Sequence, residues 1–311
     1  MKLSAMKRET LIISTLLTLF VASILMSVFQ QVHFKNLLTE DSTILNGTSG
    51  IGLIQIYGPI SVSNTSTVFG GGGGSDNWVE QIKTLKEDKR VKAIVLRINS
   101  PGGTVGASQE IYQELIKLKR ETKTPIIVSI ADVGASGGFW VAMAGDTIFA
   151  NPGSMVGNIG VIMNSMNFSE LAQKLGLEMT TYKSVTFKDT GSGWRKPTAE
   201  ENRLLQDLVK NVHEQFVTVV QTSRKLTPEK AHALADGRIY TGEQAQKAGL
   251  IDQLGTYEDA LAFAQKKAGL KGKPNIISKN QNNIQELLNL WKSEASSYFK
   301  SIAFGQFDLI H

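Results

Sequence analysis

The chain has 311 residues, of which 41% are hydrophobic and 20% charged, and a net charge of +5. This length and composition suit one large or two ordinary globular domains and exclude a wholly disordered chain. Because cysteine is absent, disulfides, thiolate nucleophiles and cysteine-ligated metals are excluded. The four histidines lie at no metal-ligand spacing and the basic residues are scattered, so we expect no metal, no cofactor and no nucleic-acid partner.

An uncharged apolar segment lies close to the N-terminus, at 10–32, and is long enough to cross a bilayer as a helix. Lys2, Lys7 and Arg8 precede it, so the positive-inside rule places residues 1–9 in the cytoplasm and the rest of the chain outside. A cleaved signal peptide is the alternative, but its apolar core would be shorter and a small-x-small site would follow. We therefore expect a single-pass protein held in the membrane lipid through this segment.

Strand-like and helix-like segments alternate beyond a polar spacer at 33–49. Apolar runs without alternation are typical of parallel strands that are covered on both faces, as in α/β proteins. Strands are predicted at 51–60, 91–98, 125–131 and 147–150. Helices are predicted at 79–86, 107–119, 136–144 and 199–223, with two more within 242–268.

Two other segments differ in character from this alternation. Five consecutive glycines at 70–74 predict a mobile surface loop, since a phosphate-binding loop would end in Gly-Lys-Ser/Thr. The tail at 271–311 begins polar and then has one apolar helical face over 284–302. Such an amphipathic helix either packs on a protein surface or lies on the membrane surface.

The main candidate for chemistry is the sequence GASGG at 134–138, between a predicted strand and a predicted helix. Its glycines leave the hydroxyl of Ser136 uncovered and let a substrate backbone approach. The N–H of Gly137 lies at a helix N-terminus, which favours a developing oxyanion. A structural glycine turn with an N-capping serine is the alternative interpretation.

A second glycine turn, NSPGG at 99–103, follows the neighbouring strand. Carboxyl ends of parallel strands meet at one sheet edge, so the N–H of Gly103 is expected to be the second oxyanion donor. The pattern G-x-S-x-G also fits an α/β-hydrolase nucleophile elbow, but no histidine has the loop context of a triad base. Lysine is the usual substitute, and Lys183 and Lys188 lie in the polar segment before the long helix, where solvated lysines are the alternative.

Together these motifs resemble the short form of the bacterial signal peptide peptidase A family. The resemblance covers the anchor and about residues 50–270. It implies an α/β fold of the ClpP/crotonase-like type, built of repeated ββα units, and a membrane-bound serine protease with a Ser/Lys dyad. The motifs that support it are NSPGG at 99–103, GASGG at 134–138, NP and GNIGV within 151–161, FKD at 187–189, and YTGEQA and GLID within 240–252.

Site residues follow from the resemblance. It implies Ser136 as the nucleophile and Lys188, rather than Lys183, as the general base, since the family's lysine directly precedes an aspartate. Asn158 stands where the family commonly has a serine that positions this lysine, and its amide oxygen can still accept a hydrogen bond. A basic lysine must be neutral, which burial favours, and Trp140, Phe187 and the bound peptide are candidates for that burial.

The resemblance also implies substrates and assembly. Remnant signal peptides and other membrane-associated peptides are the expected substrates of a protease domain outside the bacterial cell membrane. Nothing in the 52-residue spacing forces Ser136 and Lys188 together in one subunit, and the resemblance implies a homo-oligomeric ring in which a neighbour supplies Lys188. The alternatives are an acyl-CoA enzyme of the crotonase superfamily and a non-enzymatic membrane scaffold of the same fold.

Overall fold

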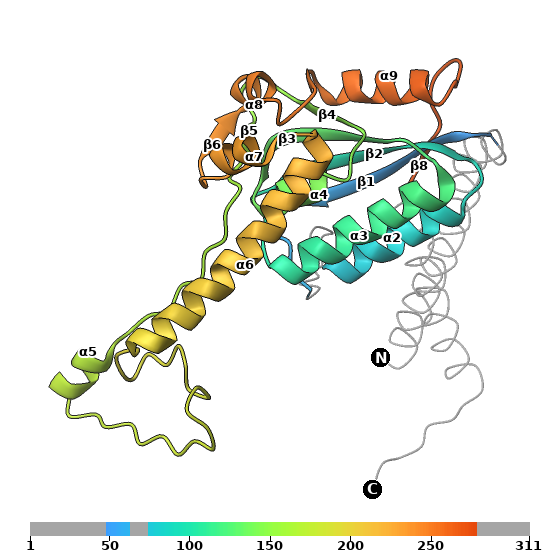
Figure 1. Ribbon diagram of the computed structural model, residues 1–311. Helices are drawn as coiled ribbons and strands as arrows, with labels where there is room; N and C mark the ends of the chain where they lie inside the picture. The colour runs from blue at the N-terminus through green and yellow to red at the C-terminus, as the bar shows by residue number, and fades with distance from the viewer. Residues whose placement is uncertain (1–47, 63–73, 279–311) are drawn as a thin grey trace, which may run out of the picture. The chain divides into compact units, whose positions relative to one another are not determined.

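A computed structural model describes residues 48–62 and 74–278, which form a mixed α/β fold around a central β-sheet (Figure 1). The three central strands, β1 (Gly50–Tyr57), β2 (Val91–Ser100) and β3 (Ile126–Ala135), run parallel. Most of their residues are buried, because helices cover both faces of the sheet. The apolar runs of the sequence therefore predicted these three strands correctly.

Shorter strands extend the sheet on both sides. β8 (Ile276–Ile277) pairs with β1, while β4 (Thr147–Ala150) pairs with the first half of β3 and with β7 (Gln253–Leu254). β5 (Met155–Gly157) pairs with the last residues of β3, and β6 (Ile239–Thr241) is its antiparallel neighbour. In the described residues a helix, not a second strand, follows each of β1, β2 and β3, so the expected ββα repeat is not seen there.

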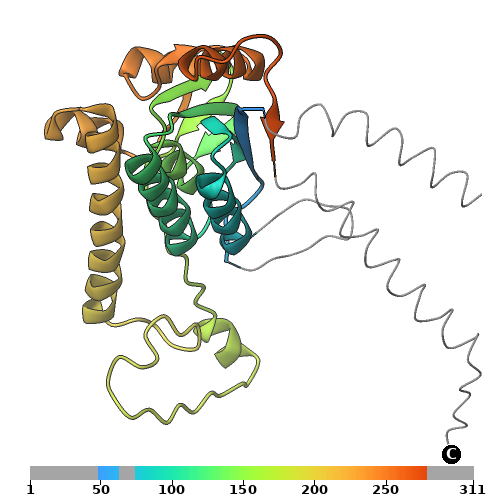
Figure 2. The ribbon, with the colours of Figure 1, turned by 90° about the vertical axis from the view of Figure 1, so that its right-hand side faces the viewer.

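Helices form layers on the two faces of the sheet. α2 (Ser75–Glu87) and α3 (Val105–Thr122) pack on one face, and α9 (Tyr257–Lys267) packs on the other (Figures 1 and 2). The larger cluster of buried apolar side chains lies between the sheet and α2 and α3, and a smaller one lies under α9. Both helices predicted for the first face extend a few residues beyond their predicted bounds, because their terminal turns carry polar side chains.

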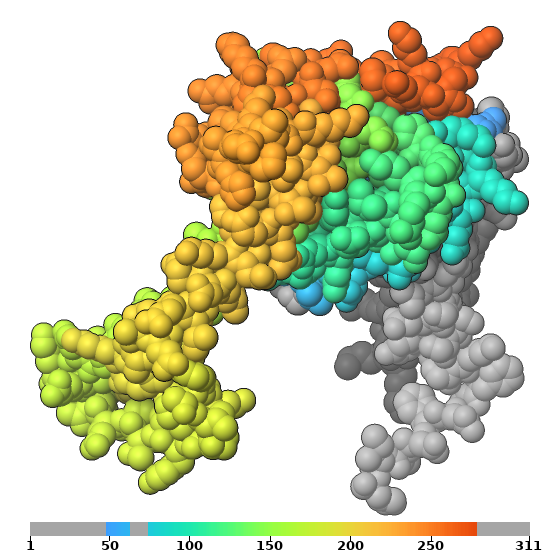
Figure 3. All heavy atoms as spheres, in the orientation of Figure 1, coloured from blue at the N-terminus to red at the C-terminus, as the bar shows by residue number. Residues whose placement is uncertain are grey.

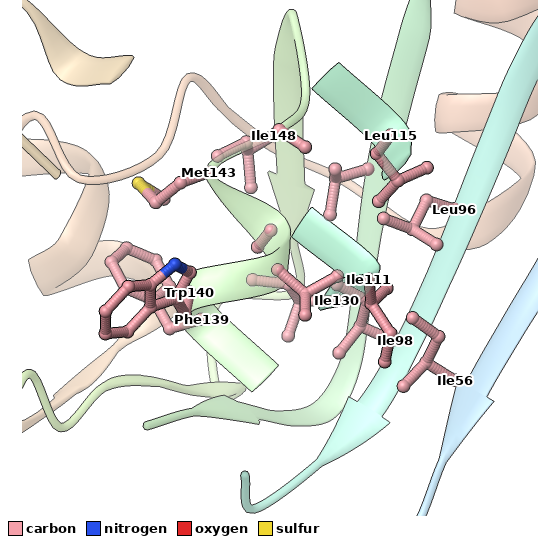
Figure 4. Packing of buried hydrophobic residues seen from close by; sticks show 14 of the residues in the cluster. Ile56, Leu96, Ile98, Ile111, Leu115, Ile130, Phe139, Trp140, Met143 and Ile148 are labelled. Atoms are coloured by element: carbon pink, nitrogen blue, oxygen red, sulfur yellow. The ribbon is translucent and has the colours of Figure 1, made fainter. Parts of the chain in front are cut away.

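A short helix, α4 (Gly137–Ala142), lies inside the larger cluster, and all six of its residues are buried. Phe139 and Trp140 point into the core (Figure 4), and Trp140 stacks on Phe216 with ring centroids 4.7 Å apart. Burying such a side chain is worth roughly 1.5–3 kcal/mol. The core therefore fixes the helix that begins directly after Ser136. Trp140 was a candidate for burying the catalytic lysine, but its side chain is packed in this core and is not available to cover a lysine.

The long helix α6 (Ala199–Arg224) has two environments. Near its C-terminal end Phe216 is buried against α4, whereas Leu204 and Leu208 in the other half are 45% and 53% exposed. That half extends away from the sheet, and α5 (Ser169–Lys174) lies near its far end (Figures 1 and 3). The apolar stripe predicted for this helix is therefore only partly buried within one chain.

Two short helices, α7 (Pro228–Leu234) and α8 (Gly242–Ala248), follow α6 and precede β7. None of the helices within 48–62 and 74–278 combines the length and the apolar character needed to cross a bilayer. The predicted anchor at 10–32, most of the glycine run and the tail beyond residue 278 lie outside the described residues.

Candidate active site

Ser136 stands between β3 and α4 in a strained backbone conformation, with φ 51° and ψ −124°. A non-glycine residue held in such a region costs about 1–3 kcal/mol, which the surrounding structure must offset. Two backbone hydrogen bonds do so: the Ser136 N–H donates to the Gly157 carbonyl, and the Trp140 N–H donates to the Ser136 carbonyl, both at 2.9 Å. The side chain is half-buried, and its hydroxyl contacts no hydrogen-bonding partner among the described residues.

The two glycine turns lie directly against each other. A Cβ built on Gly102 would lie 2.6 Å from the Gly137 nitrogen and 2.7 Å from the Ser136 Cβ. A Cβ built on Gly138 would lie 2.8 Å from the Ser100 carbonyl oxygen. Only glycine permits this approach, since real Cβ atoms do not come so close to other atoms. The turn after β2 is thereby held beside the serine.

Backbone donors near the serine remain available for a substrate. Gly103 forms a bridge with Ile60, but the bonds of this bridge come from its neighbours: Ile60 donates to Gly102 and Thr104 donates to Ile60. The N–H of Gly103 and that of Gly137 donate to no other described residue. The structure thus brings two free N–H groups beside one hydroxyl, which can stabilise a tetrahedral oxyanion.

Asn158 lies one residue beyond the carbonyl that holds Ser136. It has a left-handed backbone (φ 50°), its N–H donates to the Arg238 carbonyl at 2.9 Å, and its side-chain Nδ2 donates to the Gly237 carbonyl at 2.6 Å. Both contacts join Asn158 to one segment, residues 237–238, and the second fixes its side-chain amide. Its Oδ1 is left as an acceptor, because no described residue donates to it.

Lys188 is not brought to Ser136 within one chain. It is exposed, it lies in the turns between α5 and α6, and its N–H contacts the Val185 carbonyl at 3.4 Å. In both Figures 1 and 2 this segment lies at the far end of α6, away from α4. Phe187 beside it is 42% exposed. The expected apolar cover for the lysine is therefore absent in a single described chain.

An ion-pair network holds the segment around Lys188. Arg195 donates to both carboxylate oxygens of Asp189 at 2.8 Å and to Glu201 Oε2 at 2.8 Å. Lys183 donates to Asp189 at 2.7 Å, so the lysine that the resemblance did not implicate is already paired. Glu201 is 2% exposed and forms the capping box of α6 with Thr198.

Electrostatics of the network follow from these contacts. Hydrogen bonds from Arg195, and then from Lys183, hold the pKa of Asp189 well below its usual range. Those from Arg195 and the Thr198 backbone lower the pKa of Glu201 to about 2. This network was not predicted from the sequence, although Thr198 and Glu201 show the spacing of a capping box. Both carboxylates are thus charged at neutral pH.

The histidines have other roles. His213 Nε2 contacts the Ala235 carbonyl at 2.9 Å, and His232 Nε2 lies 3.5 Å from Glu214. Across the described part of the chain no three His, Cys, Asp or Glu side chains are grouped so that they could hold a metal ion. A serine in a strained turn beside two free N–H groups, at the carboxyl edge of a parallel sheet, has the layout of a nucleophile with an oxyanion hole.

Comparison with known proteins identifies the family. Residues 118–271 match Peptidase family S49, and residues 72–157 match Clp protease. Over 249 residues the chain is 38% identical to a protein of Enterococcus faecium provisionally named signal peptide peptidase SppA, covering 79% of this chain and 72% of that protein. The chain therefore belongs to peptidase family S49 and is a serine protease with a ClpP-like domain, as the sequence motifs predicted.

Two further relatives are also named as proteases. A protein of Synechocystis sp. that is provisionally named a protease is 44% identical over 191 residues, 61% of this chain and 68% of that protein. The chloroplastic serine protease SPPA of Arabidopsis thaliana is 32% identical over 223 residues. The match covers 71% of this chain but 32% of the Arabidopsis protein, so that relative is much longer.

Proposed function

We propose that the chain is a membrane-anchored endopeptidase with a Ser/Lys dyad. The observation that supports this most is the hydroxyl of Ser136, held by a strained turn beside the N–H groups of Gly103 and Gly137. Ser136 Oγ attacks the peptide carbonyl carbon while the neutral amine of Lys188 accepts the hydroxyl proton. The two N–H groups stabilise the oxyanion, Lys188 passes the proton to the leaving amine, and water then releases the acyl group.

The base must come from a neighbouring subunit in this proposal. A lysine acts as a base only when its amine is neutral, and burial in an apolar environment favours the neutral form. Lys188 is exposed in the single chain, so a neighbour's surface and the bound peptide have to bury it. Asn158 would then accept a hydrogen bond from the incoming amine through its free Oδ1 and position it.

Exposed apolar side chains support assembly of identical chains. Soluble monomers rarely expose large contiguous apolar patches, and such patches commonly mark protein interfaces. In a head-to-tail ring, each subunit would cover this surface of the next one and receive its Lys188. The exposed apolar side chains that lie around α5, the following segment and the first half of α6 are Ile162, Met163, Met166, Leu171, Leu175, Leu177, Met179, Tyr182, Val185, Phe187, Trp194, Leu204 and Leu208.

Substrates and location are proposed from the relatives and the sequence. One relative is provisionally named a signal peptide peptidase, and we propose remnant signal peptides and other membrane-associated peptides as substrates here. The anchor at 10–32 would hold the protease domain outside the cytoplasmic membrane of a bacterial cell. Membership of a peptidase family argues against the acyl-CoA enzyme and the non-enzymatic scaffold.

Subunit complementation tests the shared site. Full-length Ser136→Ala and Lys188→Ala variants should each be inactive, since each lacks one member of the dyad. Mixed oligomers contain sites with an intact Ser136 and an intact Lys188, so mixing the two variants should restore part of the peptide cleavage. The control is a mixture of two differently tagged preparations of the Ser136→Ala variant, which should stay inactive. An active monomer, or no restored activity despite proven subunit exchange, would show that the dyad forms within one chain.

A further inference from the structure

The amino-terminal ends of the parallel strands form a sheet edge opposite the edge that carries Ser136. β1 begins at Gly50 and β2 at Val91, and these two residues are paired with each other. The Gly50 N–H donates to the Arg90 carbonyl at 2.9 Å, and the Ile51 N–H donates to the Asn275 carbonyl at 2.8 Å. Three segments distant in sequence therefore meet here: 87–92, 117–124 and 266–275, which we call the lysine edge, at the right of Figure 1.

Charge is concentrated at this edge. The three segments carry eleven Lys and Arg against three Asp and Glu, a net charge of +8 that exceeds the +5 of the whole chain. The remainder of the chain is therefore net negative. Lys119 pairs with Asp146 at 3.1 Å, and Arg90 pairs with Asp88 at 2.6 Å. Most of the other cations are exposed, and within the described residues no ion pair holds Arg120, Lys123 or Lys267.

Helix ends account for only part of this charge. α3 and α9 both end at this edge, and cations in a last helical turn compensate the helix dipole. Lys89 follows the end of α2 at this edge, but Lys92 lies in β2, and Lys271 and Lys273 lie in the loop after α9, where no helix end explains them. The positive surface is thus larger than the helix ends require.

A cavity of about 580 Å³ opens within the lysine edge. Arg120, Lys123 and Lys267 line it, together with the ion pair of Lys119 and Asp146 and the apolar side chains of Ile127 and Phe263. The Lys267 ammonium lies 5.5 Å from the centre of the Phe263 ring. Three cations around an apolar floor suit a phosphate group that is attached to an apolar body.

The lysine edge is also the edge at which the chain enters the sheet. The polypeptide that follows the proposed anchor enters the sheet at Gly50, so only residues 33–49 separate the two. A stretch of that length can reach at most about 60 Å when fully extended. Of the two edges of the sheet, the lysine edge is thus the one tethered closest to the membrane along the chain.

We propose that the lysine edge binds anionic phospholipid headgroups, with the cavity receiving the phosphate of one lipid. This inference rests on the anchor in the proposed function and not on the Ser/Lys dyad. Clustered Lys and Arg near a membrane surface are attracted to anionic lipid, and the attraction is screened by salt. The protein is thereby held with one defined edge against the headgroups.

Because the chain has no cysteine, a single introduced cysteine can be labelled with a dye at one defined position. Thr122→Cys lies exposed on the lysine edge, and Gly153→Cys lies after β4 at the opposite edge, where an added Cβ meets no atom within 4 Å. Each full-length variant is labelled with a dye and reconstituted into vesicles that contain nitroxide-headgroup lipid. Vesicles of phosphatidylcholine alone are compared with vesicles that also contain phosphatidylglycerol, at low and at high salt.

The dye at position 122 should be quenched in phosphatidylglycerol vesicles at low salt and much less in phosphatidylcholine or at high salt. The dye at position 153 should respond equally in all of them. Combining Arg120→Gln, Lys123→Gln and Lys267→Gln should reduce quenching at 122 to its level in phosphatidylcholine. The matched control combines Lys210→Gln, Lys230→Gln and Lys247→Gln, three exposed lysines away from this edge, and should leave quenching unchanged.

Equal quenching in both lipids, or full quenching in the Arg120, Lys123 and Lys267 variant, would overturn the inference. The inference would also be overturned if the fluorescence of the dye at 122 changed with soluble polyphosphate but not with anionic bilayers. That result would indicate a soluble anionic polymer as the partner. Resistance to alkaline carbonate extraction tests the anchor separately. Ser136→Ala should abolish cleavage and keep the quenching, so failure of the dyad and failure of the lipid contact are distinguishable.

Discussion

Ser136 and Lys188 are single residues whose replacement should have the largest effect on the reaction. In the proposed mechanism Ser136→Ala removes the nucleophile and Lys188→Ala the base, and because the two act as one unit each should lower kcat roughly 10⁶-fold. Lys183→Ala should have a much smaller effect, since Arg195 still holds Asp189 in that variant. Steady-state cleavage of a fluorogenic peptide measures all three. Near-wild-type turnover by Lys188→Ala would contradict its assignment as the base.

At the scale of an element, the segment before α6 depends on Arg195 for its position. Arg195→Ala breaks the link between Asp189 and the buried Glu201, so Lys188 loses its fixed place. Misplacing a catalytic group by about 1 Å can cost 10²-fold, so we expect kcat to fall by about that factor while KM changes little. Arg195→Lys should restore part of the activity.

A matched control for this variant is Lys247→Ala, which breaks the exposed ion pair of Lys247 with Glu243 on α8. It should leave kcat unchanged. An equal loss of turnover in both variants, or an increase in KM alone for Arg195→Ala, would mean that Arg195 does not position the lysine.

Acid should loosen the same segment. The carboxyl groups of Asp189 and Glu201 have lowered pKa values when the chain is folded, Glu201 to about 2. The stability that these two charged carboxylates give the folded segment is complete above the usual carboxyl range near pH 4 and is lost as the pH falls toward 2. Hydrogen exchange of the amides in 186–201, corrected for intrinsic rates, should show wild type more protected than Arg195→Ala at pH 7 and the difference shrinking below pH 4. A constant difference would contradict the network.

The whole molecule is expected to be oriented across the membrane. If residues 10–32 form the anchor with the N-terminus inside, protease added to intact spheroplasts should digest the described domain without lysis. Immunodetection of the domain before and after treatment measures this, with a cytoplasmic protein as the control. Protection of the domain until the spheroplasts are lysed would show that the orientation is reversed.

What the sequence by itself determined is local. The motifs GASGG at 134–138 and NSPGG at 99–103 are each continuous in the chain, so both glycine turns are recognisable without a fold. The central strands were predictable because each is a continuous apolar run. The short strands β5 to β8 were not, because two or three residues show no periodicity.

Tertiary structure decided what depends on distant segments. It separated Lys188 from Ser136 within one chain and left half of α6 uncovered, because that half extends past the sheet that would bury it. It also gathered basic residues that are scattered in the sequence, because parallel strands place all their amino-terminal ends, and the loops that precede them, at one edge. Charge that is distributed along the chain thereby becomes one surface, opposite the serine.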